Sequence, residues 1–312
     1  YCSKNTYDSS VTSGQQRWLF VLTSPYQTGP WTLTAKFDPS TPVEIGEAKK
    51  NANGSVHFIV YTAVGAKLES ARATYGTAKS VLTVSHCEYN VNPLEVSKTA
   101  NTSYKRTWNW QIDKLADTTD AGQLKPGETK TVNYTIKVSA SSEDSDWKVS
   151  GKITISNPSS NPDATISSIQ DSLDVLGNVT VDCGSEVDFP YTLPSGETLE
   201  CNYSQDVKGN QDSKNTVNVT TTGFVPGANA EAKVEWGEPE EIHKCVYVKD
   251  DKYPQPNEKV CADDLDYDNK KVWEYKMVFA KSGEDVDLKC GENDYTNTVT
   301  YIATDDETYT KS

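Results

Sequence analysis

The fold class is decided by the stretch 124–138, Leu-Lys-Pro-Gly-Glu-Thr-Lys-Thr-Val-Asn-Tyr-Thr-Ile-Lys-Val. The pair Pro126-Gly127 is typical of a tight turn, because proline fixes φ and glycine accepts a left-handed backbone. Beyond the turn, polar and apolar residues alternate from Thr131 to Val138. This period of two predicts a strand with one face buried and one face in water.

The same turn-and-strand phrase occurs again further along the chain. The range 193–204 has a leucine and a proline before its turn, as Leu193-Pro194, and repeats the Gly-Glu-Thr and Asn-Tyr elements. In both copies the Asn follows the Gly by six residues. A fainter copy, Ser282-Gly283-Glu284-Asp285, leads to Cys290. A phrase of this kind used three times predicts an all-β chain of tandem antiparallel β-sandwiches.

The composition fits thin β-sandwiches and makes some partners improbable. Only 35% of the 312 residues are hydrophobic, yet the chain has 7 Trp and 17 Tyr, as expected where each strand exposes half of its residues. A formal net charge of −15 disfavours nucleic acid, whose phosphates need Lys and Arg. We expect a soluble, exported chain without a nucleic-acid partner.

The seven cysteines predict disulfides formed in an oxidising compartment. No C-x-x-C pair is present, and with only three His a zinc site is not expected. The expected pairs are Cys2 with Cys87, Cys183 with Cys201, and Cys261 with Cys290. Cys245 is then the odd residue, either a free thiol or a bridge to a neighbouring chain.

The ends of the sequence and its hydropathy favour a secreted or surface-displayed protein. The chain starts at Tyr1-Cys2, without Met or an apolar leader, which suggests a mature product after signal-peptide removal. No run of about 18 apolar residues is present, so no membrane insertion is expected.

Turn residues and strand spacing predict three domains, at 1–93, 94–240 and 241–312. The central range has the spacing of strands typical of a sandwich. The last range is short for a sandwich, and we expect it to leave an open edge that recruits a strand from another chain.

From about residue 97 to 304, the chain resembles the tandem Ig-like β-sandwich repeats of large prokaryotic cell-surface and extracellular proteins. The resemblance rests on segments shared with that pattern, which are 104–114, 133–135, 147–158, 171–173, 181–184, 193–196, 201–204, 215–221, 246–250, 273–275, 290–291 and 297–301. It implies a sandwich fold, an extracellular setting, and a role as a stalk, an adhesin segment or a filament subunit.

Two kinds of modification or ligand site are suggested by local motifs. Asp264, Asp266 and Asp268 alternate as calcium ligands do, although the EF-hand pattern fails; the alternative is a solvated acidic loop. A weaker acidic group lies at Glu143-Asp144-Ser145-Asp146. Asn-x-Ser/Thr sequons, candidates for covalent glycans, occur at Asn53, Asn101, Asn133, Asn178, Asn202 and Asn218.

No catalytic motif is recognisable, so catalytic residues are not assigned and the chain is not expected to be an enzyme. Trp108 and Trp110 alternate on one strand face, either as a sugar platform or, more commonly, as buried core. No cofactor other than calcium is suggested.

Two functional hypotheses follow, from different classes. In the first, the chain is a subunit of a helical extracellular filament that joins to its own copies head to tail, with one strand completing the open edge of the next subunit. The expected donor is 10–23, with the assembly strand Trp18, Leu19, Phe20, Val21 and Leu22; the competing donor is 295–311. In the second, the chain is a monomeric surface adhesin or stalk that binds a glycan or a protein.

Overall fold

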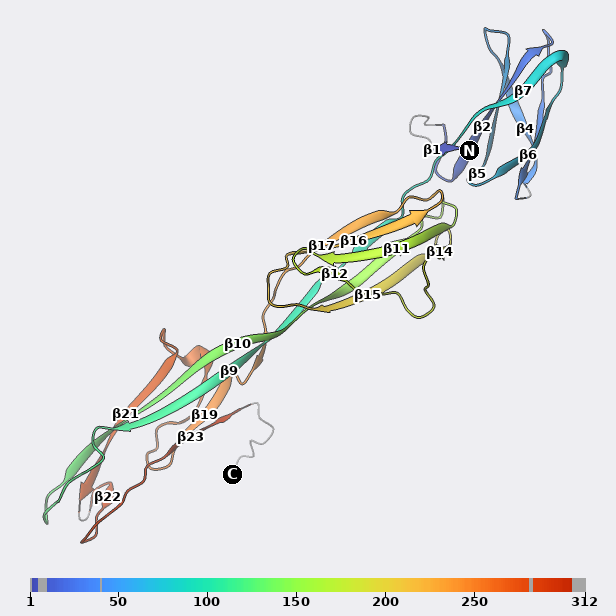
Figure 1. Ribbon diagram of the computed structural model, residues 1–312. Coiled ribbons are helices and arrows are strands. Elements are labelled where there is room, and N and C mark those ends of the chain that lie inside the picture. Colours follow the sequence, from blue (N-terminus) through green and yellow to red (C-terminus); the bar gives the residue numbers. More distant parts are fainter. Residues whose placement is uncertain (1, 5–9, 40, 281–282, 305–312) are drawn as a thin grey trace. The chain divides into compact units, whose positions relative to one another are not determined.

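The computed structural model describes residues 2–4, 10–39, 41–280 and 283–304. It confirms the all-β class: strands form several mainly antiparallel sheets, and the one helical segment among the described residues is the 3-10 turn η1 (Ala262–Asp264) (Figure 1). The chain forms two compact units. Unit 1 comprises Tyr1–Thr102, Val149–Gln205 and Asn210–Glu235, and unit 2 comprises Ser103–Lys148, Asp206–Gly209 and Trp236–Ser312.

These units do not coincide with the three consecutive ranges predicted from the sequence. The chain passes from one unit to the other inside two long strands, β9 (Asn101–Ala116) and β10 (Lys130–Ser156). A boundary inside a strand carries no linker or turn residues, so the sequence gives no sign of it.

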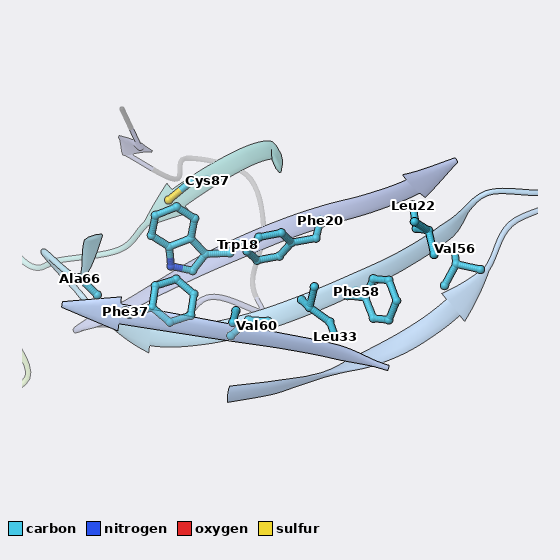
Figure 2. Packing of buried hydrophobic residues seen from close by; sticks show 11 residues of the cluster. Trp18, Phe20, Leu22, Leu33, Phe37, Val56, Phe58, Val60, Ala66 and Cys87 are labelled. Carbon is cyan, nitrogen blue, oxygen red and sulfur yellow. The ribbon is translucent and has the colours of Figure 1, made fainter. Parts of the chain in front are cut away.

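Unit 1 begins with a sheet whose strand order is β1-β7-β2-β5-β4-β3-β6. Its strands are β1 (Ser3–Lys4), β2 (Gln15–Pro25), β3 (Leu33–Asp38), β4 (Thr41–Lys50), β5 (Val56–Ala63), β6 (Lys67–Ala73) and β7 (Gly76–Tyr89). The sheet folds over its own core: the rings of Trp18 on β2 and Phe37 on β3 are 5.1 Å apart, and both are buried (Figure 2). Burial of each such side chain contributes about 1.5–3 kcal/mol.

The rest of unit 1 consists of two sheets. One contains β13 (Val181–Asp182), β15 (Thr198–Asp206), the end of β10 and β8 (Glu95–Lys98). The other contains β12 (Gly177–Val179), β11 (Ala164–Leu173), β16 (Lys214–Thr222), β17 (Ala228–Lys233) and β14 (Tyr191–Leu193). Alternate residues of β10, β11 and β16 are buried, as the period of two requires.

The two full copies of the turn-and-strand phrase have the expected structure. Gly127 has φ of +86° before β10, and Gly196 has φ of +80° before β15. Side chains rarely tolerate this left-handed region, so both turns require glycine.

Unit 2 contains strands from both ends of its sequence range. One sheet contains β9, β10, β21 (Lys270–Ala280), β22 (Val286–Asp287) and β18 (Glu240–Ile242), and the other has the order β20 (Asn257–Cys261), β19 (Cys245–Asp250), β23 (Val299–Ala303). Trp110 on β9 and Val138 on β10 share a core with Val246 and Val248 on β19. The strands that 241–312 lacks on its own are therefore supplied by residues 103–148 of the same unit.

Candidate functional site

Three disulfides tie strands together within the units. Cys2 bonds with Cys87 and Cys183 bonds with Cys201, which are two of the predicted pairs. The third prediction is wrong, because Cys261 bonds with Cys245. These two residues are directly opposite in the antiparallel pairing of β19 and β20. Cys290, the expected partner of Cys261, is the free and exposed cysteine, and Cys245 is not a free thiol.

The predicted assembly strand lies in the middle of its own sheet. β2 pairs along its length with β5 on one side and with β7 on the other. Trp18, Phe20 and Leu22 point into the core, where they pack with residues of β3 and β5 (Figure 2). Leu19 and Val21 alternate with them along the strand and are less buried. Donation of this strand to another chain would require it to leave that core.

In the acidic loop that contains Asp264, Asp266 and Asp268, carboxylates accept hydrogen bonds from backbone N–H groups of the same segment. The Asp264 carboxylate accepts the Cys261 N–H at 2.8 Å, and Asp266 accepts the N–H groups of Asp268 and Lys270, both at 2.9 Å. Among the residues that the structure describes, no three His, Cys, Asp or Glu side chains come together in a group able to hold a metal. Calcium binding at Asp264, Asp266 and Asp268 stays a prediction.

All six sequon asparagines are exposed, and their side chains are therefore accessible to a glycosylation enzyme. Asn133 is the one whose amide is engaged most closely, since its Nδ2 donates to Asp117 at 2.6 Å. Trp108 and Trp110 belong to the core of unit 2, and their indole N–H groups donate to Glu241 and to the His243 carbonyl. The strand therefore serves as core.

A cluster of Lys98, Asp171 and Asn215, here called the unit 1 cluster, is buried between the sheet of unit 1 that contains β8 and the sheet that contains β11 and β16. Lys98 is on β8, which pairs with β10, whereas Asp171 and Asn215 are on the paired strands β11 and β16. Val217 is the residue opposite Asp171, and Asn215 lies two positions from it. Asp171 and Asn215 therefore project from the same face as diagonal neighbours, with Cβ atoms about 7–8 Å apart or less.

The unit 1 cluster is dry. The side chains of Lys98 and Asp171 are 0% exposed, and so is Asn215. Lys98 Nζ lies 2.9 Å from Asp171 Oδ1, but the angles between them do not meet hydrogen-bond geometry. Five polar atoms have no hydrogen-bond partner among the described residues, which are Lys98 Nζ, Asp171 Oδ1 and Oδ2, and Asn215 Nδ2 and Oδ1.

Burial dominates the electrostatics of this cluster. It lowers the pKa of Lys98 below its usual range, against the opposing effect of the Asp171 carboxylate. Lys98 Nζ lies 3.5 Å from the centre of the Tyr203 ring, and burial likewise raises the pKa of the Tyr203 phenol. Each buried polar group left without a partner costs about 1–3 kcal/mol. As non-covalent groups, these side chains therefore destabilise the fold.

A second cluster of the same residue types, the unit 2 cluster, consists of Lys114, Asp250 and Asn297. Lys114 is on β9, Asp250 ends β19, and Asn297 precedes β23. Lys114 Nζ lies 2.6 Å from Asp250 Oδ2 and also donates to Asn297 Oδ1. The Asp250 side chain is 0% exposed and that of Lys114 is 9% exposed.

Aromatic rings enclose the unit 2 cluster. The Tyr275 hydroxyl donates to Asp250 Oδ2 at 2.9 Å and accepts from Asn297 Nδ2 at 2.8 Å. The Tyr275 ring stacks on Tyr253, with centroids 4.1 Å apart, and on Tyr134 at 5.2 Å. Burial is the main cause that raises the pKa of Tyr275. The phenol therefore stays a hydrogen-bond donor at neutral pH.

Sequence reasoning missed both clusters, although the sequence carries a signal for them. Each cluster residue stands where the alternation calls for an apolar side chain: Lys114 follows Trp110 and Ile112 in phase, Asp250 follows Val246 and Val248, and Asn215 precedes Val217 and Val219. A polar residue in the buried phase of a strand is informative, because buried polar groups need a partner or a function.

Comparisons of the chain with protein-family models, with curated proteins and with solved structures give no match. A search of the described residues finds no helix with the length and apolar character needed to cross a membrane.

Proposed function

We propose that this chain is a tension-bearing structural segment of an extracellular fibre or stalk, built from Ig-like β-sandwiches. The observation that supports it most directly is the Cys2–Cys87 disulfide, which joins the residue just before β1 to β7, the last strand of the first sheet in chain order. Since the bridge spans 85 positions of the sequence, tension entering at Cys2 passes through sulfur to Cys87. The sheet between them is not stretched.

An extracellular setting is supported by the three disulfides, which persist in oxidising compartments. The exposed sequon asparagines and the net charge of −15 agree with an exported, glycosylated and soluble surface. Cys183–Cys201 and Cys245–Cys261 add short ties between neighbouring strands.

Assembly into a filament of identical subunits is the extended form of this proposal. Donation of 10–23 would remove β2 from two strand pairings, whereas β23 pairs with β19 alone among the described strands and therefore offers an edge that could accept a strand. The competing donor 295–311 lies partly outside the described residues. Electron microscopy of the purified chain separates the two forms. Indefinite fibres support the filament, and rods of one chain length support the monomeric stalk.

Single-molecule stretching of the full chain, held at its two ends, tests the mechanical role. With the disulfides intact, the 85 residues that follow Cys2 should contribute no extension. After reduction they should add up to about 300 Å, at about 3.6 Å per residue. Equal extension in both states would contradict the proposal.

A further inference from the structure

We propose that each cluster closes an intramolecular amide bond between the lysine Nζ and the asparagine Cγ. The bonds join Lys98 to Asn215 in unit 1 and Lys114 to Asn297 in unit 2, with Asp171 and Asp250 as the respective proton-transfer groups.

The unit 1 cluster supports the bond through what it leaves unsatisfied. An amine and a carboxyl group lie 2.9 Å apart, and a carboxamide stands diagonally across from the carboxyl group on the paired strand. All three are 0% exposed, and their five polar atoms have no hydrogen-bond partner among the described residues. Burial of polar groups is normally compensated by hydrogen bonds, and native cores have few exceptions. Condensation of Lys98 and Asn215 would replace an amine and a primary amide with one neutral secondary amide, which is less costly to bury.

The unit 2 cluster supports the bond through its geometry. Lys114 Nζ contacts Asn297 Oδ1 and Asp250 Oδ2 at once, so the amine lies beside the amide carbon and beside a carboxyl group. Asp250 Oδ1 accepts the N–H groups of Lys252 and Tyr253, at 2.9 and 3.2 Å, which fixes the carboxyl group in place. Groups held in this way react with effective molarities of about 10⁵–10⁸ M.

The reaction requires a neutral amine, and the surroundings supply one. Burial disfavours the charged form of an amine, and the proposed step begins with transfer of the ammonium proton to the neighbouring aspartate. Consistently, burial lowers the pKa of Lys98. The acid then donates a hydrogen bond to the asparagine Oδ1, which polarises the carbonyl group.

The step balances without a cofactor, an oxidant or a reductant. The Nζ lone pair forms the new bond to Cγ and gives a tetrahedral intermediate. One proton leaves Nζ and, relayed by the aspartic acid, reaches the asparagine Nδ2. The Cγ–Nδ2 bond breaks, ammonia departs, and the aspartic acid is regenerated; it returns to carboxylate when it passes its proton to the departing ammonia. Each bond therefore lowers the mass of the chain by about 17 Da, the mass of ammonia.

Intact-mass spectrometry tests the proposal on the full chain, produced without glycans, after reduction and denaturation. The expected mass is below the sequence mass by about 34 Da, for two molecules of ammonia. A mass equal to that of the sequence would overturn the proposal. A loss of about 18 Da for each cluster would also overturn it, because loss of water assigns the bond to lysine and aspartate.

Variants assign the two losses to the two clusters. Lys98→Met should retain only the loss from unit 2, and Lys114→Met only that from unit 1, a deficit of about 17 Da in each case. Lys152→Met is the matched control, because Lys152 is a half-exposed lysine of β10 that forms an ion pair with Glu200, and it should retain both losses. Either cluster variant with an unchanged deficit of about 34 Da would contradict the assignment. The wild-type mass decides the question even where a variant does not fold.

Discussion

The unit 1 and unit 2 clusters contain the same three residue types in the same chain order, but their surroundings differ. Lys98, Asp171 and Asn215 lie in a dry core without hydrogen-bond partners among the described residues. Their counterparts in unit 2 are hydrogen-bonded to one another and to Tyr275. Lysine, aspartate and asparagine occur in both clusters, whereas the residues that surround them differ. The proposed bond therefore depends on these three residue types and not on a particular set of neighbours.

Both units also anchor the residue next to the asparagine with a second aspartate. In unit 1, Asp174 accepts the N–H groups of Ser213 and Lys214, which precede Asn215. In unit 2, Asp251 accepts the N–H of Thr298, which follows Asn297, at 2.6 Å. The asparagine is thus held in register with the aspartate strand by a carboxylate just outside the cluster.

The largest expected loss of stability from a single pair of substitutions comes from removing the Cys2–Cys87 disulfide of the first sheet. This sheet contains no residue of either cluster. Cys2→Ser with Cys87→Ser opens a loop with a separation of 85 residues. In the chain-entropy treatment the free energy of unfolding of unit 1 should fall by about 4.5 kcal/mol. Urea unfolding checks this, with the Cys183→Ser, Cys201→Ser pair, whose separation is 18, as the smaller reference. A larger effect from the shorter loop would contradict the entropic explanation.

Replacement of each cluster's aspartate by alanine should lower the free energy of unfolding by different amounts in the two clusters. Asp171→Ala removes the proton-transfer group, so Lys98 should stay unlinked in a core that water does not reach, and this stranded lysine alone should lower the free energy of unfolding by about 4 kcal/mol. In Asp250→Ala the unlinked Lys114 should cost less, because its side chain is 9% exposed and retains Asn297 as a partner. Asp206→Ala, at an 83% exposed side chain, is the control and should change stability little. Equal losses at Asp171 and Asp250 would show that solvent access does not distinguish the clusters.

The tyrosine hydroxyl groups beside the two clusters should also contribute unequally to stability, by smaller amounts than the aspartates. Tyr275→Phe removes bonds to Asp250 and Asn297 and should lower the free energy of unfolding by about 2 kcal/mol. Tyr203→Phe removes only the bond to the Thr99 carbonyl and should cost about 1 kcal/mol. Thermal or urea unfolding of the two variants provides the comparison, and the reverse order would refute it.

The smallest effect is the pH dependence from Asp174. Hydrogen bonds from the Ser213 side chain and backbone lower its pKa from 3.8 to about 2. A folded pKa below the ordinary value stabilises the fold above about pH 4, and this contribution disappears as the pH falls to about 2. The stability difference between wild type and Asp174→Asn should therefore shrink across that window. A difference that stays constant down to about pH 2 would rule out this carboxylate as the source.

The sequence predicts the all-β class because alternation and turn glycines are local signals, as at Val132 to Val138 and at Gly127. It does not reveal that β9 and β10 serve both units, because pairing with distant strands decides that. The Cys261 pairing was missed for the same reason, since Cys245 faces it only in the folded register. The clusters are predictable only in part. Lys114 and Asp250 stand at positions where the alternation of their strands predicts a buried side chain, but the contact between them depends on how distant strands pair.

Peptide mapping of the reduced and digested full chain tests the central claim most directly. The predicted result is two branched peptides, one joining the segment around Lys98 to that around Asn215, and one joining Lys114 to Asn297, each lighter than its two parts together by about 17 Da. Linear peptides that carry unmodified Lys98, Lys114, Asn215 and Asn297 would contradict it.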